Sequence, residues 1–148
     1  MQLEGMMQTK CPPERLVEHL SDPQLLSLMV PDGCLIGEKV GNTIAFVIRR
    51  KVGPVNLKMP GEMTVRKKAD SDAYLMEVNA SHLIAGRASV WLDLTPQRDE
   101  AGQQSLRWSG MLEAHGLAAR LIEDRAAQVG NMLKNLFLRL RKQAEARR

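Results

Sequence analysis

Residues 57–66 read LKMPGEMTVR and show the clearest alternation of apolar and polar residues in the chain. Its odd positions hold Leu57, Met59, Gly61, Met63 and Val65, and its even positions hold Lys58, Pro60, Glu62, Thr64 and Arg66. Alternation with a period of two places the two sets on opposite faces of a β-strand, one buried and one in water. The segment therefore predicts a strand of an antiparallel sheet, with Pro60 on the outward face at an edge or a bulge.

The same period continues on both sides of this strand, from residue 35 to residue 114. Turn-forming residues at 41–42, 53–54, 69–72, 85–86 and 97–103 divide the region into segments of strand length. The predicted inward positions of the other strands are Ile44, Phe46, Ile48, Tyr74, Met76, Val78, Ala88, Val90, Leu92, Leu94, Leu106, Trp108, Gly110, Leu112 and Ala114. With a further edge strand at residues 2–10, the sheet has about seven strands.

Helical patterns flank the strand region. Pro12-Pro13 and Ser21-Asp22-Pro23 each predict the start of a short helix, the second ending at Pro31-Asp32-Gly33. After Gly116 a continuous apolar stripe predicts one helix of about 28 residues, roughly 42 Å long. Alanines and Gly130 in its first half allow another group to approach closely, or leave room for a bound molecule.

These elements predict an α+β protein of one domain, residues 1–148, because the length suits a single core and no repeat interrupts the order. A curved antiparallel sheet of about seven strands wraps around the long C-terminal helix, and two short helices follow the first strand. This is the helix-grip architecture, which buries one face of the sheet and one face of the helix against each other.

Basic residues gather at the C-terminus. The chain has a net charge of +4, but residues 120–148 hold eight Lys and Arg against three Asp and Glu, so the remaining 119 residues carry −1. The sequence predicts a membrane or partner contact at Arg139, Arg141, Lys142, Arg147 and Arg148. The alternative is a solvated helix end that frays over residues 141–148. Nucleic acid is disfavoured because no aromatic residues lie among the basic ones.

Other classes of site are disfavoured by spacing. No apolar run is long enough to span a membrane and the first twenty residues lack a secretory signal, so we expect a cytoplasmic protein, peripheral at most at the inner face of the membrane. Cys11 and Cys34 are not expected to pair, and the three histidines lack metal-ligand spacing, so no metal or other cofactor is expected. Ser81-His82 and Ser109 lack a nucleophile elbow. Glu113 and His115 at the mouth of a cavity could act as acid and base, although a solvated strand end explains them more simply.

Six segments carry a resemblance to a known family: residues 12–16 (PPERL), 22–23 (DP), 30–34 (VPDGC), 51–55 (KVGPV), 61–64 (GEMT) and 86–90 (GRASV). In this order and spacing, over residues 1–142, the chain resembles the CoxG family of carbon monoxide dehydrogenase subunits, which belongs to the START-like (SRPBCC) superfamily. The resemblance implies a helix-grip fold with a hydrophobic cavity, and an accessory role beside molybdenum hydroxylases in membrane recruitment or in carrying a quinone or lipid. The chain departs from the family pattern at Asp32, which is inserted, and in its basic residues at 49–51 and 66–68.

The sequence places an apolar ligand between the sheet and the long helix. Nine methionines are many for this length, and flexible, polarizable side chains suit a cavity that adapts to its ligand, although they also simply fill a core. The residues expected to line the cavity are Met29, Phe46, Ile48, Met59, Met63, Met76, Trp108, Leu112, Leu121, Val129, Met132 and Leu133. Trp91 is expected to point outward.

Three functions follow from this interpretation. The first is non-enzymatic binding of a quinone or lipid, which would enter between the long helix and the turns at residues 30–33 and 53–59. The second is an enzyme of the polyketide cyclase or aromatase type, acting through Tyr74 or His115. The third is a scaffold that binds an oxidoreductase or another protein through Trp91 and the basic C-terminus.

Overall fold

The computed structural model describes residues 1–52, 54–82, 86–123 and 126–146, except for the side chains at 52, 55, 121, 122 and 126. Seven antiparallel strands form one sheet in the order β1-β7-β6-β5-β4-β3-β2. They are β1 (Gln2–Thr9), β2 (Cys34–Val40), β3 (Thr43–Val52), β4 (Val55–Lys67), β5 (Tyr74–His82), β6 (Gly86–Arg98) and β7 (Gln104–His115). The predicted sheet is confirmed, and β1 lies at its edge as expected.

Two short helices follow β1, as the proline pattern predicts: α1 (Pro13–Leu20) and α2 (Pro23–Met29). Pro13 occupies the first turn of α1, where a missing N–H removes no helical hydrogen bond. The Asp22 carboxylate caps α2 by accepting a hydrogen bond from the Gln24 amide at 2.9 Å. Local sequence therefore determines where both helices begin.

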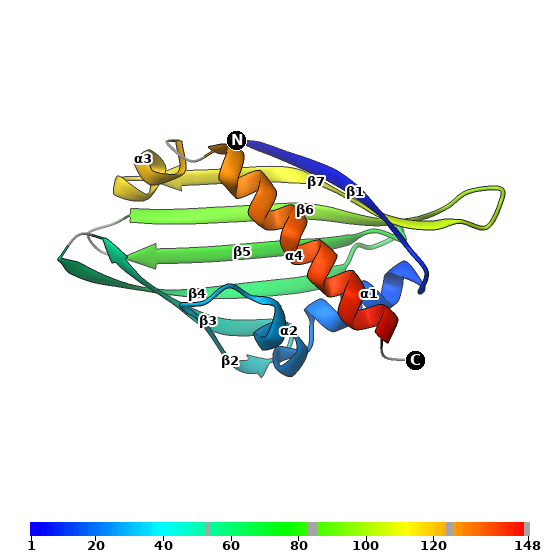
Figure 1. The fold of residues 1–148 in the computed structure, drawn as a ribbon, viewed down its shortest axis with the longest axis horizontal. Helices are drawn as coiled ribbons and strands as arrows, with labels where there is room; N and C mark the ends of the chain where they lie inside the picture. The colour runs from blue at the N-terminus through cyan, green and yellow to red at the C-terminus, as the bar shows by residue number, and fades with distance from the viewer. Residues whose placement is uncertain (53, 83–85, 124–125, 147–148) are drawn as a thin grey trace.

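The C-terminal region differs from the prediction of one helix of about 28 residues. The structure has α3 (Leu117–Glu123) and a separate α4 (Ala126–Ala146), about 32 Å long. In Figure 1, α3 lies beside the end of β7, whereas α4 runs diagonally across the sheet to α1. The two helices therefore do not share one straight axis, and residues 124 and 125 between them lie outside the described residues. The Cβ that an alanine would add at Gly130 meets no atom within 4 Å, so no group approaches this glycine closely.

The core lies between the sheet and the C-terminal part of α4. Phe137, Leu140 and Ala144 on α4 are completely buried, and the Phe137 ring stacks on Trp108 of β7 with centroids 4.3 Å apart. The predicted inward positions of the strands are buried or half-buried, whereas Trp91 on the opposite face is 37% exposed. The alternation therefore assigns the faces of the sheet correctly.

Pro60 lies on an interior strand, but at a place that behaves as an edge. β4 pairs with β3 from Val55 to Thr64, whereas its pairing with β5 begins only at Gly61. Before that point β4 has one hydrogen-bonded neighbour, so the missing N–H of Pro60 interrupts no ladder with β5. The expectation of an edge position thus holds locally.

Candidate ligand-binding cleft

The strand registers align the inward residues in rows that cross the sheet. One row consists of large apolar side chains: Ile44, Met63, Val78, Val90 and Leu112. The next row toward the β3–β4 turn consists of Phe46, Gly61, Ala80, Ala88 and Ala114. Four small residues in succession leave the inner face of the sheet low along this row.

The Phe46 ring occupies one end of the small-residue row. A Cβ built on Gly61 would lie 2.4 Å from Phe46 Cζ, so the ring covers this glycine directly. Such a Cβ would also lie 2.4 Å from the carbonyl oxygen of Asn79. Gly61 is therefore required for the position of the ring that borders the row.

Burial decreases from one end of α4 to the other. Its C-terminal half is sealed by α1, α2 and β1, but Val129 and Leu133 in the N-terminal half are only half-buried. Half-buried inward side chains also occur on the sheet, at Ile48, Met59, Val78 and Val90. Figure 1 shows α4 crossing the middle of the sheet while the ends of β3, β4 and β5 extend beyond it. We call this half-buried apolar part of the inner face, with Ile48, Met59, Val129 and Leu133, the candidate cleft.

The residues expected to bind the ligand separate into groups. Six belong to the closed core: Met29, Phe46, Met63, Met76, Trp108 and Leu112. Four are half-buried at the cleft: Ile48, Met59, Val129 and Leu133. The side chain of Leu121 lies outside the described residues. The expectation that Met132 lies on an interior face is wrong, because it is 50% exposed; it projects about 100° around the helix from Leu133.

The predicted basic contact at the C-terminus is partly engaged within the protein. Arg139 donates a hydrogen bond to the Met29 carbonyl at 3.3 Å, and Arg141 donates one to the Gln8 carbonyl at 3.1 Å. Glu145 accepts a hydrogen bond from the Lys10 amide at 2.8 Å. The helix continues to Ala146, so residues 141–146 are helical and the alternative of a frayed end does not hold for them. Lys142 is exposed, and Arg147 and Arg148 lie outside the described residues.

A second group of cations lies on the β3–β4 hairpin. We call Arg49, Arg50, Lys51 and Lys58 the hairpin cluster; all four are exposed, and they border a hollow of about 540 Å³ together with Asn56 and Leu57. Arg49 and Lys58 are directly opposite each other across the two strands. Like charges in this position destabilise a strand pair. The sequence shows Arg49, Arg50 and Lys51 as a departure from the family pattern, but only the strand register shows that Lys58 lies beside them.

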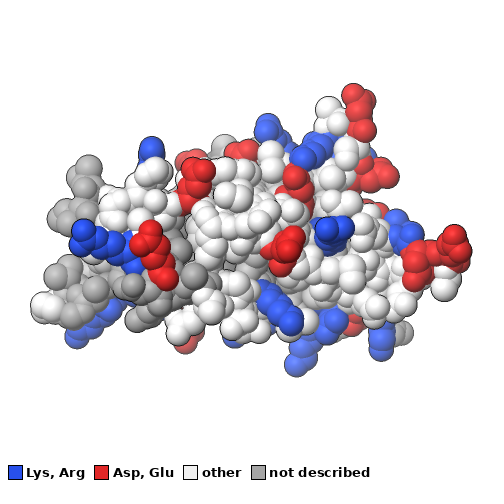
Figure 2. Space-filling model, turned by 90° about the horizontal axis from the view of Figure 1, so that it is seen from above, with Lys and Arg blue, Asp and Glu red and all other residues white. Residues whose placement is uncertain are grey.

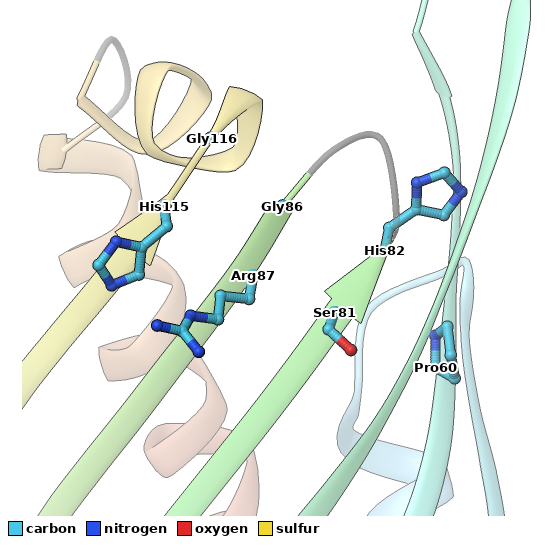
Figure 3. A pocket seen from close by; sticks show the side chains of 7 residues that line it. All are labelled: Pro60, Ser81, His82, Gly86, Arg87, His115 and Gly116. Atoms are coloured by element: carbon cyan, nitrogen blue, oxygen red, sulfur yellow. The ribbon is translucent and has the colours of Figure 1, made fainter.

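A hollow of about 790 Å³ occurs at the end of the sheet, lined by Pro60, Ser81, His82, Gly86, Arg87, His115 and Gly116. Figure 3 shows it with α4 behind the strands. Ser81, Arg87 and His115 are aligned on adjacent strands at outward positions, so this outer hollow opens on the face away from the cleft.

The positions of the residues in and near the outer hollow test two catalytic hypotheses from the sequence, a serine nucleophile with a histidine base and an acid–base pair of Glu113 and His115. Ser81 and His82 of the predicted nucleophile set are consecutive residues of β5, so their side chains point to opposite faces of the sheet. Glu113 and His115 are exposed on the outward face, so the expectation that they lie at the mouth of the apolar cavity is wrong. The described residues contain no group of three or more His, Cys, Asp or Glu side chains that could hold a metal ion. Cys11 and Cys34 are both free.

The curved antiparallel sheet and the long helix that crosses it define a START-like helix-grip fold. The family model of CoxG, a carbon monoxide dehydrogenase subunit, matches residues 5–145, and the chain belongs to this family. No curated protein matches the sequence. None of the helices in the described part of the chain is both long and apolar enough to cross a membrane.

Solved structures share the fold at low sequence identity. A conserved protein from Geobacillus kaustophilus has 16% identity and a TM-score of 0.77, with 99% of this chain and 96% of that chain covered. A STAR-related lipid transfer protein from Xanthomonas axonopodis has 15% identity and a TM-score of 0.62, with 96% and 84% covered. A Rhodobacter sphaeroides protein has 18% identity and a TM-score of 0.62, with 98% and 92% covered. These similarities confirm the helix-grip fold.

Proposed function

We propose that the protein binds an apolar molecule of the quinone or lipid class in the cleft between the sheet and the N-terminal half of α4. The observation that carries the proposal is the loss of burial along α4, from Phe137 and Leu140 in the closed core to Val129 and Leu133 at the cleft. Half-buried apolar side chains face a row of glycine and alanine, where a ligand can lie without displacing a large residue.

Binding in the cleft would be driven by removal of apolar surface from water. At roughly 25 cal/mol per Å², covering about 200 Å² of apolar surface contributes about 5 kcal/mol before the entropic costs of association. Ile48, Met59, Val129 and Leu133 supply the contacts, and Met59 can change rotamer to fit ligands of different shape. The cleft lies toward the turn between β3 and β4, which we propose as the route of ligand entry.

We further propose that the protein is a non-enzymatic accessory of a membrane-associated molybdenum hydroxylase such as carbon monoxide dehydrogenase. The name of its family supports this role, and the lipid transfer protein among the similar structures supports a lipid-like ligand. The cyclase alternative has less support, because His115 faces outward. Tyr74 is a poor base, since burial, followed by the nearby carboxylates of Glu14, Glu18 and Asp72, raises the pKa of its hydroxyl.

Filling the small-residue row tests the proposed site. Ala88→Leu places a large side chain at a half-buried position of the row, and Ala101→Leu makes the same change at an exposed position far from it. Titration with a short-chain ubiquinone or a fatty acid should show binding to the wild type and to Ala101→Leu, and an affinity at least about tenfold lower for Ala88→Leu. Equal binding by the three proteins would place the ligand elsewhere, and no binding by any of them would refute the function.

A further inference from the structure

The outer hollow gathers polar side chains that the proposed ligand cleft does not use. Ser81, Arg87 and His115 come from β5, β6 and β7 and are direct neighbours in the strand register. Adjacent strands are about 4.8 Å apart, so Arg87 has a hydroxyl on one side and an imidazole on the other. In Figure 3 the guanidinium of Arg87 extends toward the ring of His115, whereas the hydroxyl of Ser81 points away from Arg87.

The charges around this row favour an anion. The described residues that line the hollow include Arg87, His82 and His115, and none of them is Asp or Glu. The nearest carboxylate in the register is Glu113, which is opposite Ser89 and therefore diagonal to Arg87. Among the described residues Arg87 forms no ion pair, including with Glu113. Its guanidinium keeps its donors for a ligand.

We propose that the outer hollow binds a phosphate group carried on a small organic body. The five N–H donors of Arg87, the Ser81 hydroxyl and the His115 imidazole offer more hydrogen bonds than the two oxygens of a carboxylate use, whereas a phosphate accepts them on three oxygens. Pro60, Gly86 and Gly116 line the remainder of the hollow with mostly apolar surface, which suits the carbon atoms attached to the phosphate. The phosphate belongs either to a free metabolite or to a phospholipid headgroup.

NMR titration of the ¹⁵N-labelled full-length protein tests this site. The probes are inorganic phosphate, sn-glycerol 3-phosphate and monomeric dihexanoylphosphatidic acid, each in low-salt buffer. We expect amide shifts at Ser81, Arg87 and His115, and an affinity lower by about tenfold or more in Arg87→Gln. Arg107→Gln is the matched control, because Arg107 is an exposed arginine on the same face of β7 that does not line the hollow; its affinity should stay within about twofold of the wild type.

The three probes separate the two sources of phosphate. Similar affinities for glycerol phosphate and the lipid indicate a free phosphate compound, whereas tighter binding of the lipid that is lost in Arg87→Gln indicates a phospholipid headgroup. The proposal is overturned if no probe binds, if Arg87→Gln binds as the wild type does, or if Arg107→Gln weakens binding equally. Since Ala88→Leu alters the opposite face of the sheet, failure here is distinguishable from failure of the cleft proposal.

Discussion

At the scale of single residues, two glycines illustrate how differently the same residue type is used. Gly61 lies under the Phe46 ring and against the Asn79 carbonyl, whereas Gly130 faces open space on α4. From the sequence, both glycines are places where a missing side chain allows another group to approach or leaves room for a bound molecule. The two glycines differ because Phe46 of β3, 15 positions before Gly61 in the sequence, packs on Gly61, whereas among the described residues nothing packs on Gly130. The fold therefore requires glycine at 61 and only tolerates it at 130.

Replacing each glycine with alanine should have opposite effects on stability. Gly61→Ala forces the ring and the carbonyl to move, and we expect the free energy of unfolding to fall by about 1–3 kcal/mol. Gly130→Ala removes a flexible residue from a helix interior, and we expect a rise of about 0.5–1 kcal/mol. Urea unfolding followed by circular dichroism measures both. A stabilised Gly61→Ala protein would contradict the packing described for Phe46.

Individual side-chain positions were predictable where they follow the alternation of the sheet, and less so on the helices. Trp108 was correctly assigned inward, but its stacking on Phe137 joins residues 29 positions apart and cannot be read from periodicity. Met132 was misassigned because an apolar stripe widened by neighbouring methionine and leucine does not define the centre of the buried face. The exposed fraction of Met132 shows that this centre runs through Leu133, Phe137 and Leu140.

At the scale of elements, an ion pair joins α1 to β6. Arg98 donates hydrogen bonds to both carboxylate oxygens of Glu14, at 2.9 and 3.1 Å. Partial burial is the largest single influence on the pKa of Glu14 and raises it, but the Arg98 hydrogen bonds, a backbone hydrogen bond and the Arg98 charge together outweigh burial, so the pKa lies below its usual value of 4.5. A carboxylate with a lowered pKa stabilises the fold above its unfolded pKa and loses this effect as the pH falls through its folded pKa.

The Arg98→Gln variant should therefore show a stability deficit that depends on pH. Both side chains are substantially exposed, so we expect a deficit of only about 0.5 kcal/mol at pH 7. The deficit should shrink as the pH falls below 4.5, because protonated Glu14 no longer attracts the guanidinium. Thermal unfolding of both proteins across this range measures the difference. A deficit that stays constant down to about pH 2 would show that Arg98 acts through packing alone.

The hairpin cluster and the C-terminal arginines make different predictions for binding to an anionic membrane. Arg139 and Arg141 already donate to backbone carbonyls, whereas the hairpin cluster is exposed and includes a directly opposed pair of cations. If the proposed accessory role includes a membrane contact, we expect Arg49→Gln/Lys58→Gln to reduce sedimentation with phosphatidylglycerol vesicles by about tenfold or more, at about 1 kcal/mol per charge.

Arg139→Gln/Arg141→Gln is the matched control, with the same loss of charge from α4, and we expect a smaller reduction. Binding should also weaken as salt is raised, since screening shortens the reach of exposed charges. Equal losses in the two double variants would show attraction by net charge alone, and a larger loss in the α4 variant would restore the C-terminus as the contact.

Whole elements were predicted well where local sequence determines them. Alternation and turn residues gave the seven strands, and prolines with the Asp22 cap gave α1 and α2. The different directions of α3 and α4 were not predictable, because no proline or capping motif marks a change of direction. They become evident only from packing, since α3 contacts β6 and β7 whereas α4 contacts α1 and β1. The outer hollow was also missed, since it needs the register that brings Ser81, Arg87 and His115 together.

At the level of the whole molecule, positive and negative side chains are mixed on the face shown in Figure 2. Figure 2 shows Lys and Arg interspersed with Asp and Glu on the face it presents, which agrees with the near-neutral charge of residues 1–119. The candidate sites instead lie at one end of the sheet. The apolar cleft, the hairpin cluster and the outer hollow all occur near the β3–β4 turn and the facing ends of β5, β6 and β7.

This arrangement separates a closed core from an open end. α1, α2 and the C-terminal half of α4 seal one part of the inner face, and that part accounts for the completely buried residues Leu16, Leu20 and Phe137. The other part leaves apolar side chains half-exposed, which costs stability in water unless a ligand covers them. We expect an apolar molecule to occupy this open part.

Denaturing extraction of the purified protein, followed by mass spectrometry, tests this claim most directly. The protein is purified without detergent, and the Ala88→Leu variant is treated in parallel. We expect a quinone or lipid at close to one molecule per chain in the wild type and a severalfold lower amount in the variant. Wild-type protein that is consistently empty, and that stays empty after incubation with quinones and fatty acids, would contradict the account.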